Sequence, residues 1–269
     1  MNIFQDSSKP RILLGGPTNP KLSLAISEYF MNSERPTLFI NRAKPAIMFG
    51  LNRNPYIECN IKKIKDDRVK LIRQTTYSSC TYVDDGTLMV GFTGKKNQLT
   101  KDDTNKIIRD SLNRVLQYPC KLGKNDIKAK IDDKYYKIAD KSFKYTDTHY
   151  KHNVSILADT DFQATNKYLN PSKGTTHLMN MMDMSKGRKH SKDNSLCSLI
   201  QLFLIKGFAE HCQLSNVIIN KIDSGTPSFS LPAFLTVSAV NLVDSDMLLS
   251  IKKIKDTYDH LDNTECNSR

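Results

Sequence analysis

Histidine and methionine side chains are the first candidates for chemistry in this sequence. His149 and His152 have an H-x-x-H spacing near Asp147, but a zinc site needs a third protein ligand in register, and none is found. His177 and four methionines between residues 179 and 184 could attract a soft metal, although methionine more often fills gaps in packing. The sequence shows no Gly-rich phosphate loop, Ser-His-Asp arrangement or paired catalytic carboxylates. Generic motifs therefore assign neither a metal site nor a reaction.

Positive charge is the strongest compositional signal. The 40 Lys and Arg residues against 28 Asp and Glu give a formal net charge of +12, which raises the local concentration of any anionic partner. Nucleic acid, an acidic protein domain and a phosphorylated ligand would all be attracted, and a Lys-rich solvated surface explains the charge equally well. The cations form separate patches, unlike the unbroken block of a disordered basic tail. These patches lie near residues 62–65, 121–130, 186–189 and 252–255.

Length, hydropathy and cysteine spacing limit the class of protein. Hydrophobic residues make up 39% of the 269 residues, enough for one good core, or for one large and one small. No apolar run approaches the roughly 18 residues of a bilayer span, so we expect no membrane association. The six cysteines are scattered without metal-ligand or disulfide-framework spacing. This pattern favours a reducing compartment and thiols that act as small buried hydrophobes.

Short strands and amphipathic helices must position the functional side chains. Apolar residues at helical spacing predict helices over about 20–32, 54–68, 103–116, 195–212 and 244–260. Short apolar runs predict strands at 38–40 and 46–49, as a hairpin-like pair, and at 69–73, 88–92, 128–131, 135–139 and 154–157. Residues 171–194 predict a long mobile loop. Hairpins mixed with single helices favour an α+β fold over a regular βαβ alternation.

Several strings resemble the motifs of one enzyme family. The string NRNPYIECN at 52–60, with its flanking strands, resembles the N-Q-N-P-W-x-E-C-N turn of the lipoate-protein ligase and lipoyltransferase family, which belongs with the biotin ligases. GKNDI at 123–127 and YKIA at 136–139 resemble its G-R-N-D-L and K-[IV]-[SA]-G-[ST]-A strings, and YKHNVSIL at 150–157 is more loosely similar to H-H-G-T-L-L. The likeness spans roughly residues 20–240. It implies a biotin/lipoate-ligase-like α+β catalytic domain with a mixed, mostly antiparallel sheet flanked by helices.

The resemblance also implies which residues form the site. Lys137 falls at the family's lysine, which contacts the activated acyl phosphate and would stabilise charge as the adenylate forms and breaks. The spacing within the motif carries this assignment, because lysine is abundant in this region. Asn125 and Asp126 would hold the adenylate side. The other implied substrate-binding residues are Arg73, Thr76, Ser79, Thr81 and His152.

The chain departs from the family at this same site. Where the family has the loop R-R-x-S-G-G-G-x-V-x-H-D-x-G-N, this chain reads RQTTYSSCTYVDDGT at 73–87. All three glycines, which let the family's backbone pass close to the lipoyl tail, are replaced, and we expect Tyr77 to fill the acyl tunnel. Asp140 replaces the glycine that follows the lysine motif. It would place an anion next to Lys137 and the phosphate.

Two functions from different classes remain open. An active protein would activate lipoate or octanoate with ATP, with bound Mg, or accept it as lipoyl-adenylate. It would pass the acyl group to a lysine of an acidic lipoyl domain, in a dehydrogenase complex or in the glycine-cleavage H protein. An inactive protein would be a pseudoenzyme, favoured by loss at several points of one ligand site. Its basic fold would then serve as a scaffold or as an RNA-binding subunit of a mitochondrial ribonucleoprotein, through phosphate contacts.

The resemblance also sets the expected organisation and location. Residues 1–19 would be an N-terminal extension, 20–243 the catalytic domain and 244–269 a C-terminal helix and tail. We expect the small C-terminal domain of full-length ligases, opened by a W-x-W type strand, to be absent, because the chain has no Trp. Without that domain, we expect transfer of a preactivated acyl group more readily than its activation with ATP, unless a partner chain supplies the missing half. Relatives imply the mitochondrial matrix, with the cytoplasm as the alternative, although no clear transit peptide is visible.

Overall fold

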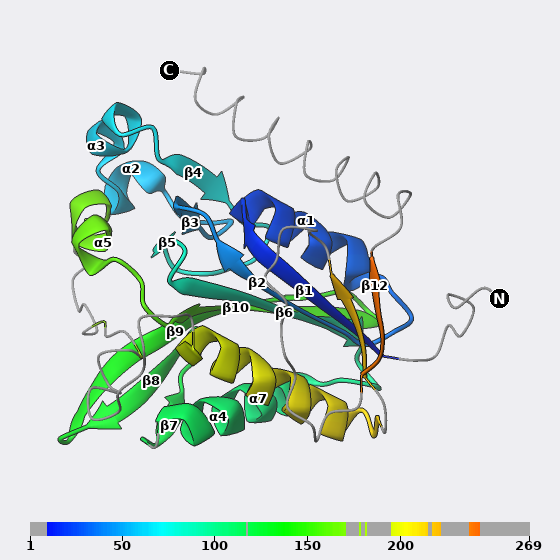
Figure 1. Cartoon of the computed structure of the whole chain (residues 1–269). Coiled ribbons are helices and arrows are strands. Elements are labelled where there is room, and N and C mark those ends of the chain that lie inside the picture. The colour runs from blue at the N-terminus through cyan, green and yellow to red at the C-terminus, as the bar shows by residue number, and fades with distance from the viewer. Residues whose placement is uncertain are drawn as a thin grey trace.

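The computed structural model describes residues 10–116, 118–170, 178, 181, 195–214, 217–221 and 237–242. A large mixed sheet and a smaller sheet lie beside one another, with helices on both sides (Figure 1). The strands of the large sheet are β1 (Arg11–Thr18), β2 (Thr37–Ala43), β6 (Thr87–Lys95), β7 (Cys120–Leu122), β8 (Asp126–Ile131), β9 (Lys134–Tyr145), β10 (His149–Leu157), β11 (Val217–Lys221) and β12 (Val237–Leu242). Those of the small sheet are β3 (Ala46–Phe49), β4 (Lys70–Arg73) and β5 (Thr81–Val83). The helices are α1 (Pro20–Met31), α2 (Pro55–Glu58), α3 (Ile61–Asp66), α4 (Lys101–Leu116), α5 (Phe162–Tyr168) and α7 (Ser195–His211).

The large sheet has the strand order β12-β11-β1-β2-β6-β10-β9-β8-β7. The run from β2 to β7 is antiparallel throughout, whereas β12, β11, β1 and β2 pair in parallel. The expected mixed, mostly antiparallel sheet of an α+β protein is therefore confirmed.

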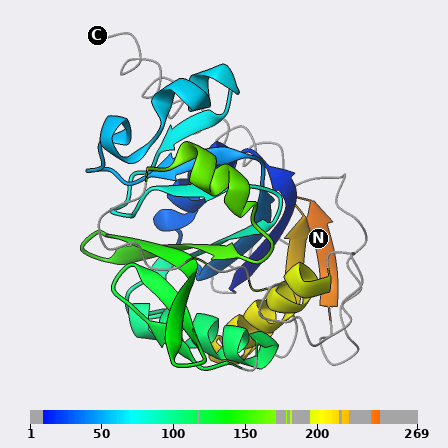
Figure 2. The same ribbon diagram turned by 90° about the vertical axis from the view of Figure 1, so that its left-hand side faces the viewer.

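The two faces of the large sheet bury different kinds of side chain. Helices α4 and α7 pack on one face over the largest hydrophobic cluster, and α1 packs on the other (Figures 1 and 2). Alternate residues of β10 follow this division. Tyr150 and Val154 belong to the cluster under α4 and α7, whereas Lys151 and Asn153 reach Glu28 and Ser27 of α1. At β10 the α1 face is therefore the polar one, although the same face also buries apolar residues such as Leu13 and Phe39. It lies next to the small sheet.

Two local predictions are wrong. The strands β2 and β3 do not form a hairpin, because β2 pairs with β1 and β6 whereas β3 pairs with β4 and β5. Pro45, between them, lacks the N–H that a continuous ladder would need. The single helix expected over 54–68 is divided into α2 and α3. Asn54 and Asn60 each cap a helix start, accepting from the N–H groups of Tyr56 at 3.0 Å and Lys63 at 3.2 Å.

Strand β1 is not predicted from the sequence, and β10 begins earlier than the sequence predicts. Strand β1 lies inside the large sheet between β2 and β11, so the sheet starts within the segment 1–19 that was expected to be an extension. Strand β10 includes residues 149–153, which the sequence predicts to be a connection.

The predicted loop over 171–194, apart from Leu178 and Met181, and the predicted helix over 244–260 lie outside the described residues. Among the helices that are described, none combines the length and apolarity needed to cross a membrane.

Candidate functional site

Lys137 lies in a cluster where the small sheet meets β9 of the large sheet. Its Nζ is 2.5 Å from Oδ1 of Asp140 and 3.4 Å from Oγ of Ser79. Ser79 donates to the same carboxylate oxygen, and Thr81 donates to Oδ2 at 2.5 Å. Asp140 is only 7% exposed. One ammonium and two hydroxyls thus converge on a pair of anionic oxygens, and the anion next to Lys137 that the sequence predicts is confirmed.

An irregularity in β9 brings Lys137 and Asp140 together. Residues three apart on a regular strand point to opposite faces. Here Ile127 of β8 pairs with Ala139, but the next residue, Lys128, pairs with Lys137, so Ile138 is an extra residue that bulges. A bulge shifts the alternation by one residue and re-aims side chains. Lys137 and Asp140 can therefore form their ion pair on one strand.

The loop between β4 and β5, residues 74–80, is held by the turn at 50–53. Leu51 donates its N–H to the Thr76 carbonyl at 3.0 Å, and Arg53 Nε donates to the Ser78 carbonyl at 3.2 Å. A Cβ at Gly50 would overlap the backbone of Ser78, so the approach of turn to loop requires glycine. The glycine that allows this close approach between two backbone segments therefore lies in the turn at 50–53 and not in the loop over 74–80.

The residues predicted at this loop occupy different environments. Ser79 and Thr81 reach the Lys137 cluster, whereas Thr76 is buried and donates to Gln74 at 3.3 Å. Arg73 donates from Nη1 to the carbonyls of Leu51 at 3.0 Å and Arg53 at 3.2 Å. Arg73 thus fixes the turn.

Tyr77 does not fill a tunnel. Its backbone bridges to Phe143 of β9, and its side chain is 62% exposed. The expectation that this tyrosine blocks the acyl group is therefore wrong, and Asp140 is the residue that occupies the polar centre of the cluster.

Asn125 and Asp126 lie at the edge of the cluster. Asp126 is directly opposite Asp140 in the β8–β9 register, and one of its oxygens is 3.4 Å from Lys128 Nζ. Asn125 is exposed, and its carbonyl accepts from the N–H of Lys141 at 2.8 Å. These two residues border the site next to Asp140.

His152 is on the opposite face of the sheet, so the structure does not bring it to Lys137. Its ring is fully buried, stacks on Phe143 with centroids 4.0 Å apart, and has Nδ1 2.9 Å from Thr104 Oγ1 of α4. Burial first, and then the nearby ammonium groups of Lys141 and Lys101, hold the pKa of His152 well below its usual value. His152 is thus a neutral core residue.

The buried imidazole predicts a pH dependence of stability. Below pH 6.5, the ordinary His pKa, the unfolded chain takes up a proton at His152 and the native protein does not, so stability falls as pH falls. We expect a slope from this residue of up to about 1.4 kcal/mol per pH unit below that value. Urea unfolding at several pH values between 5 and 7.5 would measure it. The slope should decrease in His152→Gln and persist in His211→Gln, and equal slopes in all three proteins would contradict the assignment.

A second charged network ties α1 to the loop. Glu28 of α1 accepts from Lys144 at 2.5 Å, from Lys151, and from Thr75 of the loop at 3.1 Å. Lys151 is 0% exposed. Burial acts to raise the pKa of Glu28, but the ammonium groups of Lys151 and Lys144 together hold it below its usual value. Burial lowers the pKa of Lys151, and Glu28 only partly offsets this.

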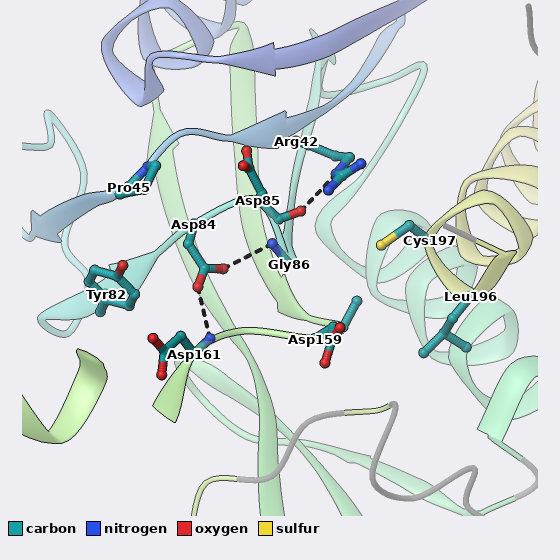
Figure 3. Close-up of a pocket in the computed structure, with 11 residues that line it drawn as sticks. Arg42, Pro45, Tyr82, Asp84, Asp85, Gly86, Asp159, Asp161, Leu196 and Cys197 are labelled. Carbon is teal, nitrogen blue, oxygen red and sulfur yellow. Dashed lines mark hydrogen bonds between the residues drawn. The ribbon is translucent and has the colours of Figure 1, made fainter. Parts of the chain in front are cut away.

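A cavity of about 440 Å³ lies at the far end of β5 (Figure 3). Its polar lining is mostly acidic, with Arg42 donating to the Asp85 carbonyl at 2.7 Å. Asp84 accepts from the N–H groups of Gly86 at 3.0 Å and Asp161 at 2.8 Å, and burial raises its pKa above the usual range. None of the predicted site residues lines this cavity. Three of its lining residues, Asp84 to Gly86, match the D-x-G part of the family loop.

Comparisons with known proteins agree with this architecture. The model of the lipoyl protein ligase A/B catalytic domain matches residues 19–193. A lipoate-protein ligase A from Bdellovibrio bacteriovorus is 26% identical over 208 residues, which cover 72% of this chain and 61% of that protein. The chain thus spans less than two thirds of the length of that curated relative.

Solved structures share the fold. LipL1 of P. falciparum in complex with lipoate superposes with a TM-score of 0.68 and 23% identity, covering 92% of this chain and 72% of LipL1. A bi-partite lipoate protein ligase from Thermoplasma acidophilum, studied with its E2 lipoyl domain, has a TM-score of 0.67 and 18% identity, covering 93% of this chain and 92% of that one. The predicted fold is that of lipoate ligases.

Proposed function

Because the chain belongs to the lipoyl protein ligase A/B catalytic-domain family, we propose that it transfers a lipoyl or octanoyl group from an acyl-adenylate to a lysine of a lipoyl domain. The observation that carries this proposal is the convergence of Lys137, Ser79 and Thr81 on two anionic oxygens. A cation with two hydroxyl donors suits a phosphate or carboxylate, because charge-assisted hydrogen bonds are the strong ones. Lys137, which the resemblance assigns to the acyl phosphate, thus lies beside two hydroxyl groups that could help it to bind one.

The same donors would act during transfer. The acceptor amine forms an amide bond to the acyl carbon, the bond from that carbon to the phosphate oxygen breaks, and AMP leaves. Lys137 would stabilise the negative charge on the departing phosphate. ATP with Mg would supply the activated acyl group if this chain performs activation as well. Asp140 must be displaced from Lys137 for any phosphate to bind there, whether that phosphate arrives with ATP or in a preactivated acyl-adenylate.

The proposal also includes a second chain that completes activation, an acidic acceptor domain and a location in the cell. The bi-partite archaeal ligase matches this chain over nearly all of both lengths, which supports a second chain that completes activation. The basic surface, with a net charge of +12, suits an acidic lipoyl domain of a dehydrogenase complex or of the glycine-cleavage H protein as acceptor. We place this reaction in the mitochondrial matrix, which fractionation of the tagged protein would test.

Thermal unfolding with and without lipoyl-adenylate tests the proposed site. A ligand that binds only the native state should raise stability by about 2.7 kcal/mol at a hundredfold excess over its dissociation constant. Lys137→Ala should lose this stabilisation, measured against its own ligand-free protein. Lys134→Ala, at an exposed lysine of the same strand, should retain it. No stabilisation of the wild type at millimolar ligand would refute the acyl-adenylate site.

The ion pair between Lys137 and Asp140 favours a second candidate, a pseudoenzyme that keeps the fold as a basic RNA-binding or scaffolding subunit. In that case the internal carboxylate would permanently replace the ligand phosphate. Binding to RNA through phosphates should weaken steeply between about 50 and 200 mM salt. Filter binding with a mixed-sequence RNA distinguishes the two functions, since a transferase without an RNA role would show no saturable binding at 150 mM salt.

A further inference from the structure

Two cysteines far apart in sequence have adjacent thiols in the fold. Cys59 Sγ and Cys80 Sγ are 3.2 Å apart. Cys59 follows α2, is 2% exposed, and is fixed by its N–H bond to the Pro55 carbonyl at 2.8 Å and by its bridge to Leu169. Cys80 is half-buried at the end of the loop over 74–80. One thiol is therefore anchored at the end of a helix, and the other lies in a segment outside the strands.

We propose that Cys59 and Cys80 are a modification site at which hydrogen peroxide forms a reversible disulfide. A disulfide needs a sulfur separation of about 2.05 Å, so the two sulfurs must approach by about 1 Å. Cys80 belongs to no strand, so this movement breaks no strand pairing at Cys80. Formation of this disulfide needs no acyl ligand, so it can be tested separately from the proposed acyl transfer.

The hydrogen bond between the thiols assigns their roles. Either sulfur could be the donor in this contact. With Cys80 as the donor, the hydrogen bond lowers the pKa of Cys59 despite its burial and the nearby Glu58 carboxylate. The same hydrogen bond and burial raise the pKa of Cys80. Because the thiolate is the nucleophile, Cys59 is the first to react and Cys80 is the resolving thiol.

The chemistry balances with peroxide as the oxidant. The Cys59 thiolate attacks one peroxide oxygen, the O–O bond breaks, and a sulfenic acid forms as hydroxide leaves and becomes water. The Cys80 sulfur then attacks the Cys59 sulfur, so that the S–S bond forms and the S–O bond breaks. The Cys80 proton leaves with the second water. Two thiols give up two electrons, and one hydrogen peroxide is reduced to two waters.

The position of Cys80 connects this bond to the Lys137 cluster. Its two neighbours, Ser79 and Thr81, are the residues that hydrogen-bond Asp140. Joining Cys80 to Cys59 would fasten this part of the loop to the end of α2. The disulfide would therefore restrain the two hydroxyls that surround the Lys137–Asp140 ion pair.

Peptide mapping tests the proposal on the full chain. The reduced protein is treated with hydrogen peroxide, denatured, alkylated with N-ethylmaleimide, digested and analysed by mass spectrometry. We expect a peptide that links Cys59 to Cys80 in most molecules, lost after dithiothreitol, with Cys120 still alkylated. The link should vanish in Cys80→Ser and persist in Cys212→Ser. Full alkylation of both cysteines after peroxide, or oxidation to sulfinic acid without a link, would overturn it.

Hydrogen exchange supplies a measurement on the wild type that does not depend on the variants folding. Amides of residues 74–81 should exchange more slowly in the oxidised protein than in the reduced protein, whereas those of α4 should be unchanged. Equal exchange over 74–81 in both states would contradict a link that restrains the loop. Neither experiment contains an acyl ligand, so their failure would leave the transferase proposal unaffected.

Discussion

Asp140→Asn should raise the affinity for lipoyl-adenylate by about tenfold to a hundredfold. The carboxylate of Asp140 now holds the ammonium and the hydroxyls that would bind a phosphate, and its negative charge opposes any anion that enters. Asparagine keeps the size and an acceptor oxygen for Thr81 but removes the charge. A hydrogen bond to a charged group contributes about 1.5–3 kcal/mol, which corresponds to one or two orders of magnitude in the dissociation constant.

Isothermal titration calorimetry with lipoyl-adenylate would measure this gain. Asp133→Asn is the matched control, because Asp133 pairs with Lys130 at 2.6 Å at the β8–β9 turn and its side chain is 91% exposed. The control should bind as the wild type does. If Asp140→Asn bound no more tightly than the control, the view that Asp140 occludes an anion site would be wrong.

Glu28→Ala should lower the free energy of unfolding by about 3–5 kcal/mol, because it leaves a buried ammonium without its counterion. Lys151 is fully buried, so water cannot replace the lost carboxylate. The loop would also lose the hydrogen bond from Thr75 Oγ1 to Glu28 Oε2. Urea unfolding followed by far-UV circular dichroism would measure the change.

Two further variants separate charge burial from packing. Glu34→Ala removes a carboxylate that is 63% exposed and pairs with Lys95, and exposed pairs contribute at most about 1 kcal/mol. Combining Glu28→Leu with Lys151→Met should recover most of the loss, since apolar residues can replace a buried ion pair. A Glu28→Ala loss no larger than that of Glu34→Ala would show that Lys151 is solvated.

The long helices followed from apolar periodicity and the mixed sheet from the family resemblance, but neither predicted the buried polar segments. Residues 149–153 of β10 look like a connection because they include His, Lys and Asn. In the fold they are buried, since Lys151 and Asn153 find partners on α1 and His152 finds one on α4. A search for alternating apolar residues does not detect a strand whose buried side chains are polar. Such side chains are hydrogen-bonded by residues that are distant in sequence.

The site was predictable in part, through motif spacing. That spacing pointed to Lys137, Ser79 and Thr81, which the fold brings together, and the substitution at Asp140 pointed to the ion pair. It could not reveal the bulge at Ile138, because a bulge is a matter of register between two strands. It also missed Glu28 and the Cys59–Cys80 pair, which meet only through tertiary packing. That His152 lies apart from Lys137 could not be predicted, because the sequence does not say which face of a strand carries a given side chain.

The position of β1 determines when this protein can finish folding on the ribosome. β1 pairs in parallel with β11, so that Ile12 lies beside Ile219, and its other neighbour β2 emerges much earlier. During synthesis, the edge of β1 that pairs with β11 stays unpaired until most of the chain has been made. An unpaired edge strand can recruit other chains, and contacts that are distant in sequence form slowly. Nascent chains that end before residue 217 should therefore depend on chaperones more strongly than those that extend beyond 221.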